Sequence, residues 1–435
     1  MFTYVSSVEE KDDLNRLKML EHASMHTDFY PLMWHSAKGA LVFNRNGDAW
    51  IDFTSAIAVA NSGHSNEFVV DALKNALEEP LLATYNFPHR YRLELAEQLG
   101  KLLDDSTGES YGLHFMSSGS EAVESSIKVA LDHHNQAESV IVSFYNAFHG
   151  NTLQSDSISG ITRHSLFTSD KGDKVHYIKL PFQSRSSKTQ SVSFQKNISD
   201  TLDKYGLSEY MVTGIIMEPY QGKGVFVADQ QLINEVIEFC NATDALLIVD
   251  EIQSGFYRTS RRFAFEHFDI SPDIICLGKG LTSSLPMSAI AVKRDIFNKS
   301  NELDIATTHS ANPISCVAAI ANIKFMENKE FRQNLLDVSR SFKTQIDKLA
   351  EKYQNAISYS EVFGMVASLH ITIDGQHSKT LAEKIARDSF KNGLLLSMPN
   401  GPHGSFLRIT PPLVIKNEML EQGMQILDNA LSERL

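Results

Sequence analysis

Cysteine is scarce in this chain of 435 residues. It has three, Cys240, Cys276 and Cys316, at no spacing that suits a metal site. A low and odd cysteine count favours a reducing compartment. Long apolar runs are also missing, so we expect no segment that crosses a bilayer. The opening stretch, MFTYVSSVEEKDD, has neither a basic flank nor an apolar core, so we expect no secretory signal and a cytoplasmic protein.

Excess positive charge is lacking too, because the formal net charge is -13. An acidic chain does not suit nucleic acid or an anionic membrane as a partner. Anionic small molecules remain possible ligands, because a local pocket can oppose the overall sign. No grouping of His, Cys and Asp has the spacing of metal ligands, so we expect no metal.

Short apolar segments and helical patterns alternate through the middle of the chain. The strand-like segments are ESVIVSF, VTGIIMEP, ALLIVDE, DIICLG and SAIAVK. This alternation predicts an α/β fold with a mostly parallel sheet covered by helices on both faces. We assign residues 66–315 to this large domain, and residues 1–65 and 316–435 to a smaller α+β domain.

Two of these apolar segments end in residues with distinctive chemistry. Asp250 ends one strand in LLIVDEIQSGFYRTS, and Lys279 follows another in CLGKGL. Ligands of open α/β sheets bind beyond the carboxyl ends of the strands, so both residues could face one pocket. A desolvated lysine can form a Schiff base with an aldehyde, and an aspartate can hold a proton on a ring nitrogen. Together they fit pyridoxal 5'-phosphate, although a solvated lysine and a helix-capping aspartate are the simpler alternatives for each residue alone.

Two further segments fit the same cofactor. In FMSSGSEAVESS, Ser118, Gly119 and Ser120 lead directly into a predicted helix, whose first N–H groups can bind a phosphate. Any capped helix would look similar. In FYNAFHG, Phe148 could cover one face of the cofactor ring, or it could be a core aromatic residue.

These segments, in this order, resemble the class III aminotransferases, which are pyridoxal phosphate enzymes of fold type I. The resemblance covers nearly the whole chain. It implies a large domain with a mostly parallel, seven-stranded type of sheet and a smaller α+β domain built from both chain ends. The 29 residues from Asp250 to Lys279 match the family's spacing. Further matching segments are IDFTSAIAVANSGH, SSGSEAVESSIKVA, FHGNT, IIMEPYQGKGV, TTHSANPISCVAA and FLRITPPLVI.

The resemblance implies a role for each matching residue. Lys279 would form the Schiff base and move the proton, and Asp250 would pair with the pyridine nitrogen. Arg408 would bind the substrate carboxylate. The remaining cofactor contacts would be Ser118, Gly119 and Ser120 at the phosphate, Phe148 stacked on the ring with His149 beside it, Glu218 in support, and Gln253 near the 3-hydroxyl. Thr308 would reach the phosphate of a neighbouring subunit, which implies a homodimer with shared active sites.

The implied function is ping-pong transfer of an amino group from an amino acid or amine to a keto acid or aldehyde. Lys223 departs from the family, which has a glutamate there in users of ω-amino acids, and Asn151 replaces an arginine of 4-aminobutyrate users. Lys223 could bind a second anionic group of a substrate, or be a surface lysine. His309, Ser310 and Ala311 follow a variant seen in racemase-like relatives.

Several alternatives therefore stay open. On the same fold they are an amino acid racemase or epimerase, an aminomutase and a decarboxylating transaminase. A catalytically silent binding protein is a further one. A nucleotide-binding protein would need a G-x-x-x-x-G-K-[ST] loop, which the sequence lacks.

Overall fold

The computed structural model describes residues 8–22, 29–160, 164–168, 172–186, 192–300 and 303–435. By its internal contacts the chain divides into two units, Met1–Glu67 with Asn328–Leu435, and Phe68–Glu327. The second boundary lies later than residue 315, because helix α10 (Pro313–Met326) packs against α4 (Arg90–Thr107) and belongs with the second unit.

The second unit is built around an eight-stranded sheet with the strand order β4-β13-β12-β11-β8-β5-β7-β6. Six strands share one direction, while β13 and β6 run against it. The predicted mostly parallel sheet is confirmed, with one strand more than the seven-stranded type. The additional strand, β6, is a short antiparallel edge strand whose Leu166 and Thr168 are exposed, so it lacks the apolar pattern of its neighbours. The strands are β4 (Tyr111–Met116), β5 (Glu138–Phe144), β6 (His164–Thr168), β7 (Lys174–Leu180), β8 (Val212–Met217), β11 (Leu246–Asp250), β12 (Ile274–Leu277) and β13 (Ser288–Lys293).

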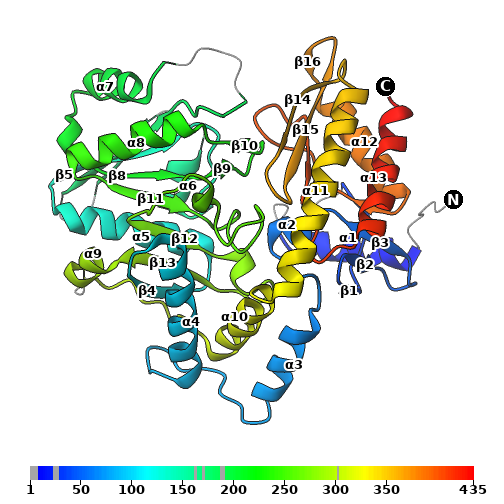
Figure 1. Ribbon diagram of the computed structural model, residues 1–435, viewed down its shortest axis with the longest axis horizontal. Coiled ribbons are helices and arrows are strands. Elements are labelled where there is room, and N and C mark those ends of the chain that lie inside the picture. The colour runs from blue at the N-terminus through cyan, green and yellow to red at the C-terminus, as the bar shows by residue number, and fades with distance from the viewer. Residues whose placement is uncertain (1–7, 23–28, 161–163, 169–171, 187–191, 301–302) are drawn as a thin grey trace. The chain divides into compact units, whose positions relative to one another are not determined.

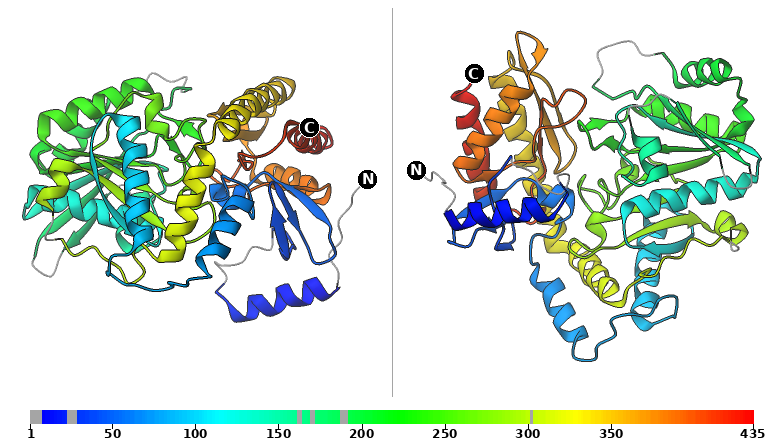
Figure 2. Two further views of the ribbon diagram at one scale, coloured as in Figure 1. Left: turned by 60° about the horizontal axis from the view of Figure 1, so that its bottom comes forward. Right: turned by 180° about the vertical axis from the view of Figure 1, so that it is seen from behind.

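Helices cover both faces of this sheet. Helix α5 (Gly119–His134) and helix α8 (Gln230–Thr243) lie on opposite sides of it (Figures 1 and 2). Ile141, Ile216, Ile248 and Ile274 of the central strands are fully buried, which is why these strands read as continuous apolar segments. The other helices of four residues or more are α3 (Glu67–Ala76), α6 (Leu153–Ser159), α7 (Phe194–Tyr205), α9 (Arg294–Lys299) and the 3-10 helix η3 (Ala264–His267). A hairpin of β9 (Tyr220–Gln221) and β10 (Phe226–Val227) follows β8.

The first unit combines both ends of the chain in an α+β arrangement. Strand β17 pairs in parallel with β3, which joins the C-terminal part to the N-terminal part. Its strands are β1 (Ser36–Lys38), β2 (Leu41–Phe43), β3 (Ala49–Asp52), β14 (Ile357–Val362), β15 (Ala367–Ile373), β16 (Gln376–His377), β17 (Leu394–Leu395) and β18 (Phe406–Ile409). Its helices are α1 (Val8–Leu20), α2 (Ser55–Ala58), α11 (Lys329–Lys352), α12 (Lys379–Lys391) and α13 (Asn417–Ser432).

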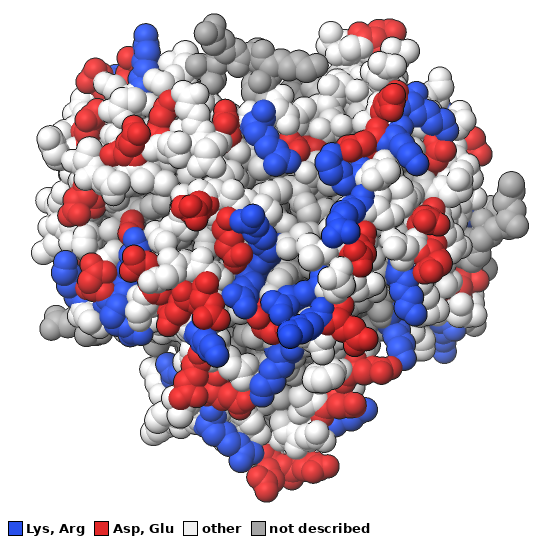
Figure 3. Space-filling view, viewed as in Figure 1, with Lys and Arg blue, Asp and Glu red and all other residues white. Residues whose placement is uncertain are grey.

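Acidic and basic side chains are interspersed on the face shown in Figure 3, so the net negative charge is not gathered there in one patch. Among the helices of the described residues, none combines the length and the apolar character needed to cross a membrane.

Candidate active site

A cavity of about 200 Å³ lies where the strands of the second unit end and α5 begins. It receives residues from the start of α5, from the loop after β5, and from the ends of β8, β11 and β12. Most of the residues predicted to touch a cofactor are therefore brought together. The lining residues are Gly119, Ser120, Phe148, His149, Gly150, Asn151, Glu218, Asp250, Ile252, Gln253 and Lys279.

Asp250, the last residue of β11, is buried and held from two sides. Its Oδ2 lies 2.8 Å from Nδ1 of His149, and its Oδ1 accepts a hydrogen bond from the N–H of Ile252 at 3.0 Å. An ionised carboxylate can only accept, so His149 Nδ1 is the donor when Asp250 is charged. His149 is itself buried, and its Nε2 has no hydrogen-bond partner among the described residues. The imidazole therefore fixes the orientation of the carboxylate at the end of the strand.

Glu218, which follows β8, joins two loops around the cavity. Its Oε2 accepts the N–H of Phe148 at 3.0 Å, and its Oε1 accepts the N–H of Gly222 at 2.9 Å. Burial raises the pKa of Glu218 to about 7, and the charge of Asp250 adds to this, while His149 and the two N–H donors oppose it. The carboxylate thereby fixes both the aromatic residue and the β9–β10 hairpin.

The start of α5 presents backbone N–H groups at the cavity. Ser118 is the N-cap: its Oγ accepts the N–H of Glu121 at 3.3 Å, and Glu121 Oε2 accepts the N–H of Ser118 at 2.7 Å. This capping box engages the Ser118 side chain with the helix, and Ser118 does not line the cavity. Gly119 does line it, and a Cβ there would lie 3.0 Å from Ile252 Cδ1. A side chain at position 119 would therefore be tight unless Ile252 shifted by a few tenths of an ångström.

The loop after β5 closes on the same helix start. The N–H of Asn151 donates to Ser120 Oγ at 3.2 Å. Gly150 has a φ of 147°, and a Cβ there would lie 2.4 Å from both Ser120 Oγ and Ser155 Oγ. Only a glycine fits this position, which the sequence patterns did not reveal.

Lys279 begins the short 3-10 helix η4 (Lys279–Leu281) directly after β12. Its φ is 37°, a left-handed conformation that is uncommon for a residue with a side chain and that often occurs at functional sites. Gln253 lies nearby in the lining, where its Oε1 accepts the hydroxyl of Tyr220 at 3.2 Å. A Cβ on Gly222 would lie 2.9 Å from Gln253 Nε2, so Gly222 is a second site glycine that sequence reasoning missed.

The sequence matches the family described as aminotransferase class-III over residues 23–431. The chain belongs to the class III aminotransferases. This confirms the family and the enzyme class predicted from the motifs.

Curated relatives support the same assignment. They include a 2-aminoadipate transaminase of Pseudomonas putida, 31% identical over 93% of this chain and 96% of that protein. A probable 4-aminobutyrate aminotransferase of Bacillus subtilis is 29% identical over 91% of each chain. A leucine/methionine racemase of Thermococcus litoralis is 28% identical over 98% of this chain and 96% of that protein.

Solved structures confirm the fold of this class III aminotransferase. A Bacillus anthracis aminotransferase superposes with a TM-score of 0.84, at 24% identity, over 99% of this chain and 100% of its own. An S-selective transaminase from Arthrobacter sp. with alanine bound gives a TM-score of 0.82, at 22% identity, over 99% of this chain and 98% of its own.

Two residues predicted for the site, Thr308 and Arg408, are not among the residues that line this cavity. Thr308 is exposed in the turn 308–311 and does not line the cavity. Arg408 is a buried residue of β18 in the first unit, where its Nη2 donates to Ser397 Oγ at 3.5 Å. The roles expected for Thr308 and Arg408 stay predictions.

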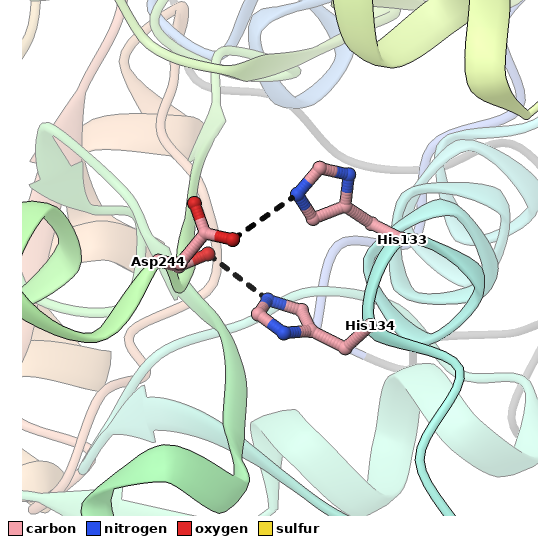
Figure 4. A group of neighbouring side chains, drawn as sticks. All are labelled: His133, His134 and Asp244. Carbon is pink, nitrogen blue, oxygen red and sulfur yellow. Dashed lines mark hydrogen bonds and ion pairs between the residues drawn. The ribbon is translucent and has the colours of Figure 1, made fainter.

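A separate group of His133, His134 and Asp244 lies at the ends of α5 and α8 (Figure 4). His134 Nε2 lies 2.9 Å from the carbonyl oxygen of Asp244, and His133 Nε2 lies 3.8 Å from its Oδ2. No spacing in the sequence indicated this group, because the aspartate comes from a distant helix end. These contacts join two helix ends outside the cavity.

Proposed function

We propose that the cavity holds pyridoxal 5'-phosphate and that the enzyme moves an amino group between an amino acid or amine and a keto acid or aldehyde. The observation that carries this proposal is that Lys279 and Asp250, from adjacent parallel strands, line one cavity together with the N-terminus of α5. When bound, the cofactor supplies an aldehyde that takes up the amino group and a ring that withdraws electrons.

The residues of the cavity fit such a cofactor. The N–H groups at the start of α5, next to Gly119 and Ser120, suit a phosphate. Phe148 offers an aromatic face, and the Gln253 amide offers a polar partner for a ring hydroxyl. Gly119 and Gly150, where a Cβ would meet Ile252 and Ser120, let the backbone pack closely at this helix start.

The protein's own groups then divide the chemical work. Among the described residues that line the cavity, Lys279 provides the amine, which would bind the aldehyde and, once released, move a proton at its Nζ. Asp250 would hold a proton on the ring nitrogen, and His149 would keep that carboxylate in place. Glu218 would keep Phe148 against the ring through the backbone N–H it accepts.

We also propose a homodimer with shared sites, because large apolar side chains are exposed beside the Thr308 turn. Phe87 and Leu93 are 74% and 62% exposed, and a patch of such residues typically marks an interface. The exposed apolar residues of the segment 77–93 are Leu77, Leu82, Tyr85, Phe87 and Leu93. Two contacts join this segment to the residues around the turn. Asn312 Nδ2 donates to the carbonyl of Leu82 at 2.8 Å, and His89 Nε2 lies 2.9 Å from the carbonyl oxygen of Ala311. A second copy on this surface would lie next to the turn that carries Thr308. If this surface forms the dimer, Phe87→Asp should yield monomers in light scattering. Thr308→Ala should weaken cofactor retention in the dimer, and unchanged retention would remove Thr308 from the site.

Arg408 is proposed to bind the substrate carboxylate, in the bidentate way that a guanidinium allows. Arg408→Ala should then raise KM for a carboxylate substrate and leave cofactor affinity unchanged. A cytoplasmic location is proposed as well, because the three cysteines are free and buried, which suits a reducing compartment.

Absorbance spectroscopy of the purified protein tests the central proposal. We expect a visible band of lysine-bound cofactor that converts to the amine form when a suitable amino donor is added. Lys279→Ala should lose that band, whereas Lys128→Ala, at an exposed position of α5, should keep it. A normal band in Lys279→Ala would refute the role of Lys279. A band that persists with every donor while an amino acid loses its chirality would instead indicate a racemase.

A further inference from the structure

Outside the cavity, His133, His134 and Asp244 bring three side chains that can bind a metal to one point of the second unit (Figure 4). Each residue offers one ligand atom, and these three atoms lie within 4.8 Å of one another. The two histidines belong to the last turn of α5, and Asp244 is the C-cap of α8, just before β11. Both imidazole rings are directed toward the aspartate.

The His133 imidazole is largely buried and makes no hydrogen bond to the described residues. Its side chain is 11% exposed, its Nδ1 has no partner, and its Nε2 lies 3.8 Å from Asp244 Oδ2, which is too long for a hydrogen bond. Two ligands of a tetrahedral Zn²⁺ ion, each about 2.0–2.2 Å from the metal, lie about 3.4 Å apart. The separation of His133 and Asp244 is therefore closer to that of two metal ligands than to that of a hydrogen-bonded pair.

The charges at this point favour a cation. Helices α5 and α8 both end here, and the last carbonyl groups of a helix carry partial negative charge. Asp244 adds a full negative charge at the end of α8, and in the described part of the chain no lysine or arginine forms an ion pair with it. Its side chain is 85% exposed, so an ion can reach the carboxylate directly from solvent.

His134 is suited to bind a metal because its imidazole is held in the neutral form. Burial lowers the pKa of His134, a charge on His133 adds to this, and Asp244 opposes it through its carbonyl and its charge. His134 Nε2 donates to that carbonyl at 2.9 Å, and a shift of the proton to Nδ1 would free Nε2 for a metal. Two imidazole nitrogens and a carboxylate oxygen suit Zn²⁺, Ni²⁺ or Cu²⁺, whereas Ca²⁺ and Mg²⁺ take oxygen ligands.

We infer that His133, His134 and Asp244 bind a divalent transition metal ion such as Zn²⁺, with water completing its coordination. The ion would join the end of α5 to the turn between α8 and β11. Helix α5 has 16 residues, so about 24 Å of helix separates the ion from Gly119 at the cavity. The ion would therefore stabilise the second unit and take no part in the reaction.

Calorimetric titration with ZnCl₂ of protein that has been treated with a chelator and desalted tests this inference. Wild type should bind about one Zn²⁺ per chain at this site, and MgCl₂ should give no comparable binding. Asp244→Asn and His134→Gln should each weaken Zn²⁺ binding by at least about tenfold. Both variants should fold, because asparagine tolerates the left-handed backbone at position 244, and glutamine can still donate to the Asp244 carbonyl. The control, His22→Gln, removes an exposed histidine of the first unit and should bind as wild type does.

Thermal unfolding with and without Zn²⁺ gives a second readout. The ion should raise the unfolding midpoint of wild type and leave that of Asp244→Asn unchanged, since only a state that binds the ion is stabilised by it. Amino-group transfer should be the same in wild type and variant. Absence of Zn²⁺ binding, or equally tight binding by wild type and both variants, would overturn the inference. Equal binding of Mg²⁺ would overturn it as well, because charge alone would then hold the cation.

Discussion

Glu218→Gln is a direct test of how the cavity is held together. The two carboxylate oxygens of Glu218 each accept one backbone N–H, from Phe148 and from Gly222. A glutamine offers one oxygen, so one of these N–H groups would face an NH₂ group and lose its acceptor. A buried donor without a partner costs about 1–3 kcal/mol.

The pH dependence of stability adds a second effect of opposite sign. Burial raises the pKa of Glu218 from its ordinary value of 4.5 to about 7, so the native state binds this proton more tightly than the unfolded state. The stability contributed by Glu218 is therefore full below pH 4.5 and is lost as the pH rises through about 7. At about 1.4 kcal/mol per pKa unit, the loss is on the order of 3 kcal/mol. A glutamine has no such proton, so the variant does not lose this stability as the pH rises.

Urea unfolding of the cofactor-free proteins at a series of pH values measures both effects. Near about pH 5 the variant should be less stable than wild type by about 1–3 kcal/mol. By about pH 8.5 the difference should have moved in the variant's favour by on the order of 3 kcal/mol. Glu238→Gln, at an exposed position of α8, should follow wild type at every pH. If Glu218→Gln also ran parallel to wild type across the series, the raised pKa and the reasoning from it would be refuted.

Three further predictions concern single contacts of the site. Gly150→Ala should destabilise the enzyme by at least about 1–3 kcal/mol and weaken cofactor retention, because its Cβ would meet Ser120 Oγ; near-normal melting would contradict this. Ser118→Ala should cost about 1 kcal/mol of unfolding free energy through the lost cap, and cofactor retention should hardly change, so a large loss of retention would show a direct phosphate contact instead. His149→Leu should weaken cofactor retention on gel filtration because Asp250 loses its imidazole donor, and His149→Asn, which can still donate, should recover part of it.

Matched controls separate these effects from general damage. Gly100→Ala places a Cβ where no atom lies within 4 Å, inside the helix α4. It should leave cofactor retention close to that of wild type and raise the free energy of unfolding by up to about 1 kcal/mol, because alanine suits a helix interior better than glycine. The cofactor readout should be taken at a temperature where each variant remains folded.

The strands of the large sheet were predictable because they are buried on both faces. Segments such as ESVIVSF and SAIAVK form β5 and β13 with the predicted bounds, Glu138–Phe144 and Ser288–Lys293. Strand β6 was not predictable, because an edge strand with exposed residues carries no continuous apolar pattern. The second boundary between the two units lies near residue 327, and we expected it at residue 315, for a related reason. Helix α10 is apolar all round, so its sequence does not show which unit it packs into.

The meeting of Asp250 and Lys279 in one cavity was predictable, because their positions at the ends of strands determine where they lie. A residue at the carboxyl end of a parallel strand has to lie at one edge of the sheet, and this places Asp250 and Lys279 in a common cavity. The groups that hold these two side chains come from segments far apart in the sequence, so their contacts depend on how the chain folds. The bond between His149 and Asp250 joins residues 101 positions apart, and the contact of Gly222 with Gln253 depends on how a hairpin folds back. Neither has a signature in the sequence of its own segment.

The arrangement of the two buried acids shows how the cavity keeps its charge in one place. Asp250 and Glu218 are close enough that the charge of the first raises the pKa of the second, and the buried cavity wall screens this repulsion poorly. Only Asp250 is bonded to the imidazole of His149, whereas Glu218 accepts two neutral backbone N–H groups. Near neutral pH, Glu218 can therefore take up a proton and still accept at least one of these bonds. Two equally charged acids would repel each other, so the different hydrogen-bond partners of Asp250 and Glu218 reduce this repulsion while Glu218 still holds the two loops.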